Sequence, residues 1–365
     1  MIRRRLDWIW TLARSYRIAK RQGSSLLLDI AAIVLALLLS LVGTVVLIAT
    51  YGASPAETLQ ALFKGAFGTR NAVLETLVQA TPLMFTGLAV VVAFRGRMFN
   101  IGGEGQFWAG AVAAAWISMR YGSLPGPIAI PLIIAGAAAG GGLWGFIPGY
   151  LKAKFQVNEI IVTVMLNYAI MFFVSYLVSG PWREPNQYYL QTVRFETATD
   201  LPTFFGSRIH LGLFIAVLLA VSVYILLWKT PFGFDIRAIG DNPTSSRYRG
   251  VKVETMLVLI MVLSGALAGI AGAGELNGLH HRLKLDISNR FGFTGLLVAQ
   301  LGKLHPLGVI FAAIFFGALV NGSTGMQIYT GVPVSLVYTV QGMVLVFLLA
   351  SEALTRYRIV RVDND

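Results

Sequence analysis

The run TMLVLIMVLSGALAGIAGAGE, residues 255–275, has one carboxylate at its last position and no other charged side chain. An α-helix needs roughly 20 mostly apolar residues to cross a membrane, which this run supplies. Nine further apolar runs flank it, at residues 29–51, 73–94, 101–119, 126–147, 157–180, 210–228, 289–302, 305–322 and 332–350. The sequence therefore predicts an all-α polytopic membrane protein with about ten transmembrane segments, some of them short or broken.

The composition of the whole chain agrees with this prediction. Of 365 residues, 56% are hydrophobic and only 13% are charged, and the mean hydropathy is +0.70. Soluble domains carry about 25% charged residues, so this chain has too few to cover a water-soluble globule of its size. The net charge of +12 does not indicate nucleic-acid binding, because the basic residues lie between the apolar runs. With no cysteine in the chain, disulfides and thiolate metal sites are excluded.

The basic residues also predict the orientation. Ten segments place both termini on one side, and 20 of the 29 lysines and arginines fall on that side. Lysine and arginine are enriched in cytoplasmic loops, so both termini are expected in the cytoplasm. Residues 276–290 run against this pattern, because the expected outer side then holds His280, His281, Arg282, Lys284 and Arg290. Segments 289–302 and 305–322 are short and are interrupted at residues 302–306. They can therefore be two half-helices or a re-entrant pair, and the sequence does not decide between these arrangements.

No polar linker separates folding units along the chain. We expect a basic cytoplasmic segment at 1–28, a single transmembrane domain at 29–350 and a cytoplasmic tail at 351–365. Glycines at four-residue spacing, such as Gly141 with Gly145 and Gly265 with Gly269, favour close packing of helices within one subunit.

The stretch RGRMFNIGGEGQ, residues 95–106, is the densest polar sequence beside a predicted span. Three glycines in four residues weaken the helix and expose backbone groups next to Asn100, Glu104 and Gln106. These side chains form part of a translocation pathway, or they mark a helix start where Glu104 meets the positive end of the helix dipole. The sequence leaves both interpretations open.

A second polar set occupies residues 156–168. Asn158 is a plausible helix N-cap and Glu159 a first-turn acid. Asn167 and Tyr168 lie deeper in the same span, where they either bond a neighbouring helix or line the route of a polar solute. No metalloprotease or serine-hydrolase motif accompanies them, and no metal site or catalytic residue is predicted.

The longest polar stretch on the expected inner side is KTPFGFDIRAIGDNPTSSRYRGVKVE, residues 229–254. Asn242 or Asp241 can cap a short helix that begins at Pro243, and Gly250 can end it. A stiff, short amphipathic helix is therefore expected on the inner face.

This stretch resembles the coupling segment of permease subunits of bacterial ABC importers, in the branched-chain amino acid and simple-sugar superfamily. Residues 99–106, 157–168 and 305–308 resemble other signature stretches of that family, and the likeness runs from about 73 to 350. Two of these stretches together look most like the subgroup that imports nucleosides with an external lipoprotein. The outer loop 181–209 has no match.

The resemblance implies a multi-pass permease subunit of the bacterial inner membrane, not an enzyme. It implies no cofactor in this chain, ATP and Mg²⁺ in a partner ATP-binding subunit, a second permease that is a paralogue, and an extracytoplasmic substrate-binding lipoprotein. The residues expected to line the substrate pathway are Asn100, Glu104, Gln106, Asn167 and Tyr168. Those expected to couple the chain to the ATPase are Arg237, Gly240, Asp241, Asn242, Pro243, Arg247 and Gly250.

Two alternatives stay open. An ion-coupled secondary transporter needs a carboxylate inside a span, for which Glu75 and Glu104 are the candidates. The same class of importer can instead carry a sugar or another heterocycle. The chain has no phosphate-binding glycine-rich loop, because Lys303 is followed by Leu304 instead of serine or threonine, so any ATP must be bound by a partner.

Overall fold

The computed structural model describes residues 16–20 and 26–361, and its chain divides into two compact units. The first unit combines residues up to 55 with residues from 335 onward. In it, helix α2 (Leu26–Thr50) packs against helix α14 (Ser335–Arg356), and strand β1 (Tyr16–Lys20) pairs antiparallel with strand β2 (Tyr357–Arg361). The sequence did not predict these strands. Much of the predicted basic segment 1–28 lies outside the described residues.

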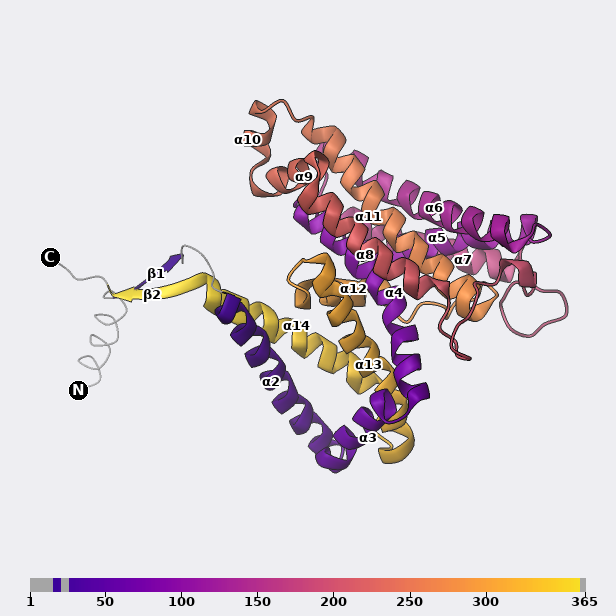
Figure 1. The fold of residues 1–365 in the computed structure, drawn as a ribbon, viewed down its shortest axis with the longest axis horizontal. Helices are drawn as coiled ribbons and strands as arrows, with labels where there is room; N and C mark the ends of the chain where they lie inside the picture. The colour runs from indigo at the N-terminus through magenta and orange to yellow at the C-terminus, as the bar shows by residue number, and fades with distance from the viewer. Residues whose placement is uncertain (1–15, 21–25, 362–365) are drawn as a thin grey trace. The chain divides into compact units, whose positions relative to one another are not determined.

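The second unit, residues 56–334, is mostly helical (Figure 1), apart from the loop 181–209 and the shorter connections. Its helices are α3 (Pro55–Phe67), α4 (Arg70–Arg95), α5 (Gly103–Tyr121), α6 (Gly126–Phe155), α7 (Glu159–Ser179), α8 (Leu211–Lys229), α9 (Pro231–Asp241), α10 (Pro243–Tyr248), α11 (Val253–Glu275), α12 (Phe291–Leu301) and α13 (Pro306–Thr330). A π-helical turn, η2 (Leu276–His280), continues α11, and a short 3₁₀ turn, η1 (Thr197–Thr199), lies in the loop before α8.

Helices α4 and α11 form the core of the second unit. Helix α4 packs on α11, α12 and α13, while α11 also packs on α5 and α6 (Figure 1). Glycine permits these close approaches: a Cβ on Gly141 would lie 2.2 Å from the carbonyl oxygen of Gly265, and one on Gly110 would lie 2.3 Å from Cα of Gly269. The predicted close packing at these glycines is confirmed, and it holds helices of one subunit together.

Each of the ten predicted segments coincides with a helix. Among the described residues, seven helices are long and apolar enough to cross a membrane: α2, α4, α6, α7, α8, α11 with its π-turn, and α13. Helix α12 has 11 residues, about 16 Å at 1.5 Å per residue, which is half of the 30 Å hydrocarbon thickness. The predicted interruption at 302–306 is confirmed, since Lys303 and Leu304 adopt φ values of 55° and 51° between α12 and α13.

Helices α3 and α9 lie in stretches that the sequence did not predict to be helical. Helix α9 begins where the Thr230 hydroxyl accepts a hydrogen bond from the Gly233 N–H at 3.1 Å, with Pro231 in the first helical position. A hydroxyl N-cap followed by proline is a common helix start, so the pair Thr230 and Pro231 already indicated this helix in the sequence.

The unmatched loop 181–209 lies against residues 276–290. The backbone N–H of Leu201 donates to the Asn277 carbonyl at 2.9 Å, and that of Phe195 donates to the His281 carbonyl at 3.0 Å. Acidic residues of the loop also pair with the basic stretch, as Glu184 does with Arg282. Acidic partners therefore offset part of the positive charge that runs against the predicted orientation.

Candidate translocation and coupling sites

The side chain of Asn100 joins the α4–α5 connection to α11. Its Nδ2 donates to Gln106 Oε1 and to Ser264 Oγ, both at 2.8 Å, and its Oδ1 accepts from the Gly102 N–H at 2.9 Å. Ser264 in turn donates to the Ala89 carbonyl of α4 at 2.7 Å. Asn100 is 1% exposed, so this network is closed to solvent.

Asn167 fastens α7 to the start of α5. Its Oδ1 accepts from the Gly105 N–H at 2.8 Å, and its Nδ2 donates to the Ile101 carbonyl at 3.1 Å. A Cβ on Gly105 would lie 2.7 Å from that same Oδ1, so the contact requires glycine. At the glycine-rich helix start predicted at residues 102–105, the backbone is therefore exposed to α7, whose Asn167 side chain forms hydrogen bonds with it.

Glu104 joins the start of α5 to the start of α12. Its Oε1 accepts from Trp108 Nε1 at 3.1 Å and from Ser288 Oγ at 2.5 Å, and its Oε2 accepts from the Gly292 N–H at 2.9 Å. A Cβ on Gly292 would lie 2.1 Å from the Glu104 nitrogen, so the two backbones nearly touch. The carboxylate is 3% exposed and is held by three donors.

Four of the five predicted pathway residues therefore lie around one helix start. Tyr168 does not join them, because it is 58% exposed on another face of α7. The polar atoms of the buried four bond each other, neighbouring side chains and backbone groups, so in this conformation they connect helices. Sequence reasoning missed Ser264 and Ser288, although Ser264 interrupts the apolar run 255–275 and could have been noticed as the one hydroxyl inside it, since Thr255 stands at its start.

Helix α10 has the predicted cap and the predicted end. Asn242 Oδ1 accepts from the N–H groups of Thr244 and Ser245 at 3.0 and 3.1 Å, Pro243 opens the helix, and Gly250 adopts a φ of 87° just beyond it. Its outer face is exposed: Tyr248 is 90% exposed. The side chain of Arg247 forms an ion pair with Glu254 of α11. Asp241, the last residue of α9, is also exposed.

Helix α9 is packed tightly onto the core at the same end. A Cβ on Gly240 would lie 2.1 Å from the carbonyl oxygen of Arg95, the last residue of α4. The guanidinium groups of Arg95 and Arg237 lie 5.0 and 5.8 Å from the ring centre of Trp228 in α8. Arginine over an indole ring is an attractive contact. The Trp228 ring thus joins α4, α8 and α9.

The α12–α13 connection belongs to this assembly as well. Arg95 Nε donates to the Leu304 carbonyl at 2.9 Å, and the His305 ring lies 5.0 Å from that of Trp228. Burial, and then the charge of Arg95, lower the pKa of His305 below its usual value. Helix α9, the end of α4 and the break between α12 and α13 are therefore joined by a continuous set of contacts through Arg95 and Trp228.

A groove of about 450 Å³ opens beside α10. It is bordered by the α4–α5 connection, the end of α6, and the facing parts of α9, α10 and α11. Its charged side chains are Arg97, Lys152, Glu159 and Arg247, of which Lys152 and Glu159 pair at 2.9 Å. Within residues 16–20 and 26–361 no cluster of three or more potential metal ligands occurs.

Comparison with known proteins finds permease components of transport systems in each case. The family described as "Branched-chain amino acid transport system / permease component" matches residues 72–349. The guanosine ABC transporter permease protein NupP of Bacillus subtilis is 38% identical over 88% of this chain and 93% of its own. A glucose ABC transporter permease protein of Haloferax volcanii is 33% identical over 87% and 86%, and the nucleoside ABC transporter permease protein NupB of Lactococcus lactis is 33% identical over 84% and 87%.

Proposed function

Because this chain belongs to the family of permease components of branched-chain amino acid transport systems, we propose that it forms part of the path by which an ATP-driven importer carries nucleosides. It is a multi-pass membrane protein and a transport component, not an enzyme. The nucleoside substrate is inferred from relatives named for guanosine and nucleoside transport, each of which this chain matches over most of its length.

The observation that carries the mechanism is the rigid segment formed by α9 and α10. A permease without an ATP site must receive motion from a partner through a stiff surface element. Helix α10 is capped at Asn242, ends at a left-handed Gly250 and exposes its outer face, while α9 is locked to α4 through Gly240. We therefore assign Arg237, Gly240, Asp241, Asn242, Pro243, Arg247 and Gly250 to coupling with the ATP-binding subunit.

This assignment fixes the proposed orientation. ATP is cytoplasmic, so the α9–α10 end of the second unit faces the cytoplasm, and loop 181–209 with residues 276–290 faces outward. Both termini are proposed to be cytoplasmic, with ten helical segments in the membrane domain 29–350. ATP and Mg²⁺ bind in the partner, an external lipoprotein delivers the substrate, and a paralogous permease completes the pathway, as the resemblance to the nucleoside subgroup implies.

The proposed pathway opens at the start of α5. Asn100, Glu104, Gln106 and Asn167 supply amide and carboxylate groups there, which suit the hydroxyls and ring nitrogens of a neutral nucleoside. When the ATP-binding subunits close, α9 moves α4 and the α12–α13 connection, and the bonds of this network exchange protein partners for solute. Tyr168 is proposed to contribute from the exposed face of α7, beside the second permease.

A reconstituted complex tests this function. The permease, its paralogue, the ATP-binding subunit and the lipoprotein are placed in vesicles, and uptake of labelled guanosine is measured with and without ATP. We expect uptake to require both ATP and the lipoprotein. Uptake driven by a Na⁺ or H⁺ gradient without ATP would instead establish the secondary-transporter alternative.

A sugar is the second candidate substrate, because the glucose permease of Haloferax volcanii is as similar to this chain as the Lactococcus nucleoside permease is. Competition separates the two. Excess unlabelled glucose should leave guanosine uptake unchanged, while excess adenosine or inosine should reduce it. Glucose uptake that exceeds guanosine uptake would reassign the substrate within the same transporter class.

A further inference from the structure

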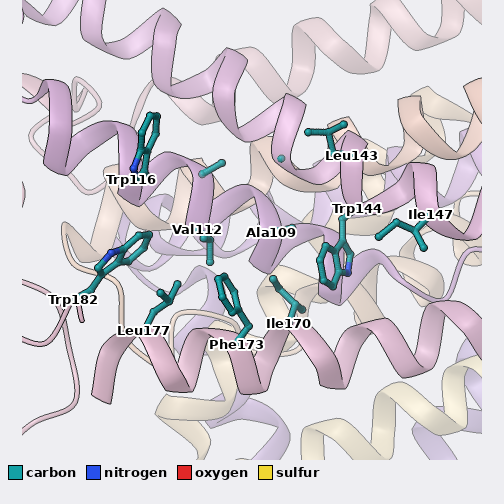
Figure 2. Close-up of a pocket in the computed structure, with 12 residues that line it drawn as sticks. Ala109, Val112, Trp116, Leu143, Trp144, Ile147, Ile170, Phe173, Leu177 and Trp182 are labelled. Carbon is teal, nitrogen blue, oxygen red and sulfur yellow. The ribbon is translucent and has the colours of Figure 1, made fainter. Parts of the chain in front are cut away.

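Three helices of the second unit border an open apolar cleft of about 460 Å³ (Figure 2). Trp116 of α5 and Trp182, just beyond α7, stand at one end, and Trp144 and Ile147 of α6 stand at the other. Helices α5 and α6 meet at its floor, where a Cβ on Gly140 would lie 2.8 Å from the Ala109 carbonyl. Helix α7 forms the remaining wall with apolar side chains that include Phe173.

The cleft extends from one membrane surface toward the middle of the bilayer. Its α5 border runs from Ala109 to Trp116, about 10 Å along the helix at 1.5 Å per residue. One leaflet contributes about 15 Å of hydrocarbon, half of the whole core. Trp116 lies near the end of α5 and Trp182 follows the end of α7, both far along the chain from the α9–α10 coupling segment. Trp144 and Ile147 lie in the half of α6 that leads to Lys152 at the groove beside α10. The cleft thus opens at the end opposite the α9–α10 segment and continues past the middle of α6.

The side chains that line the cleft disfavour binding of a polar solute. No charged, hydroxyl or carboxamide side chain borders the cleft, and its polar side-chain atoms are the N–H groups of three indoles. A nucleoside bound there would lose the hydration of its ribose hydroxyls without gaining partners. A hydrocarbon chain loses nothing of this kind and gains van der Waals contact with the apolar side chains of the cleft.

Two arginines follow the tryptophans at one end of the cleft, and their charge suits a lipid phosphate. Arg120 follows Trp116 by one helical turn and therefore lies on the same face of α5. Arg183 follows Trp182 directly, and its Nη2 donates to the Gln187 carbonyl at 3.0 Å. Both arginines are exposed, and tryptophan beside arginine is typical of the membrane–water interface.

We propose that this cleft binds one phospholipid of the leaflet opposite the coupling segment, with an acyl chain between α5, α6 and α7 and its phosphate at Arg120 and Arg183. The lipid fills the gap left where α7 stands away from the α5–α6 pair. It thereby fixes the position of α7, whose Asn167 bonds the start of α5. The inference does not depend on the substrate or on the ATP-driven mechanism.

Fluorine NMR of the full chain, labelled with 5-fluorotryptophan, tests the acyl chain. The protein is reconstituted in phosphatidylcholine vesicles with a nitroxide at mid-chain, and the Trp144 signal is assigned with Trp144→Phe. We expect the nitroxide to broaden the Trp144 signal at least fivefold more than that of Trp108, which is 2% exposed and serves as the internal control. Equal broadening of the two signals would overturn the proposal and indicate an empty cleft or one covered by the second permease.

Two variants complete the test. Ala113→Phe fills the cleft and should remove the excess broadening at Trp144, whereas Leu218→Phe on the exposed face of α8 should leave it unchanged.

The headgroup contact is tested separately. The double variant Arg120→Gln with Arg183→Gln should retain at least threefold less co-purified phospholipid, measured by native mass spectrometry. Equal retention would refute the phosphate contact, and if broadening also persisted in Ala113→Phe, the acyl-chain site would be refuted with it.

Discussion

Asn100 illustrates how a single side chain serves the second unit. Its amide donates two hydrogen bonds and accepts two, and it connects α11 to the entry of α5. Hydrogen bonds between helices in membranes contribute about 0.6 kcal/mol each on average. Such bonds are individually weak enough to exchange, yet several of them together connect α4, α5 and α11 in this structure.

Replacing Asn100 with alanine tests this network. Asn100→Ala leaves the Gly102 N–H and the Gln106 amide without their partner, at a cost of about 1–3 kcal/mol for each unsatisfied group. We expect a lower thermal unfolding midpoint and at least fivefold slower nucleoside uptake. Gln187→Ala, in the exposed loop 181–209, is the matched control and should stay within twofold of wild type. If Asn100→Ala also stayed within twofold, the amide would have no part in the pathway.

His210 gives the protein a predictable response to acid. It caps α8, is 1% exposed, and its Nδ1 accepts from the Gly212 N–H at 3.1 Å. Burial, and then the charges of His281 and Arg208, lower its pKa to about 4, below the usual 6.5. A lowered pKa stabilises the folded state at pH values above 6.5, and that contribution is lost as the pH falls toward 4.

The expected loss of stability follows from the difference between the folded and unfolded pKa values of His210. Each pH unit in this window removes about 1.4 kcal/mol from the free energy of unfolding. Denaturation of the purified protein at pH 7, 6, 5 and 4 should therefore show a steeper loss of stability for wild type than for His210→Gln. Parallel pH profiles for the two proteins would mean that His210 does not titrate in this window.

At the scale of elements, the contact between α9 and α4 transmits motion only if it is close. A Cβ on Gly240 would lie 2.1 Å from the Arg95 carbonyl, so Gly240→Ala must displace α9. We expect ATP hydrolysis to continue while the number of nucleosides imported per ATP falls at least threefold. Gly342→Ala in α14, where a Cβ meets nothing within 4 Å, is the control. An unchanged ratio in Gly240→Ala would remove α9 from the transmission route.

Helix α10 carries the second prediction at this scale. Arg247→Glu replaces the ion pair with Glu254 by two like charges and reverses the sign of the surface presented to a partner. We expect it to uncouple ATP hydrolysis from transport while membrane insertion stays intact. Full uptake in vesicles that contain the ATP-binding subunits would reject this role. Tyr248→Ala, at an exposed residue of the same helix, separates the charge effect from lost packing.

The elements were more predictable than the site. Ten apolar runs are visible in the sequence because hydrocarbon demands length and apolarity, and the cap at Asn242 was visible because Pro243 and Gly250 accompany it. Helix α3 was missed because it is amphipathic and too short to span. The partners of Glu104 were unpredictable because Ser288 and Gly292 lie 184 and 188 residues away. Only the fold brings them together.

At the scale of the whole molecule, one set of contacts links the proposed coupling surface to the proposed pathway. Helix α9 touches the end of α4, and Arg95 holds the α12–α13 connection. Helix α12 in turn supplies the Gly292 N–H that binds Glu104 at the start of α5. In the proposed mechanism, a displacement of α9 therefore reaches the polar network through α4 and α12 of the second unit.

The central claim is that α10 contacts a separate ATP-binding subunit. Because the chain contains no cysteine, the single substitution Tyr248→Cys gives a unique attachment point for a short cross-linker. The control is Phe172→Cys on the exposed face of α7. In the assembled importer, we predict that the Tyr248→Cys variant cross-links to the ATP-binding subunit, that the yield changes when ATP binds, and that the control does not cross-link. A Tyr248→Cys variant that cross-links to that subunit no more than the control does would contradict the account.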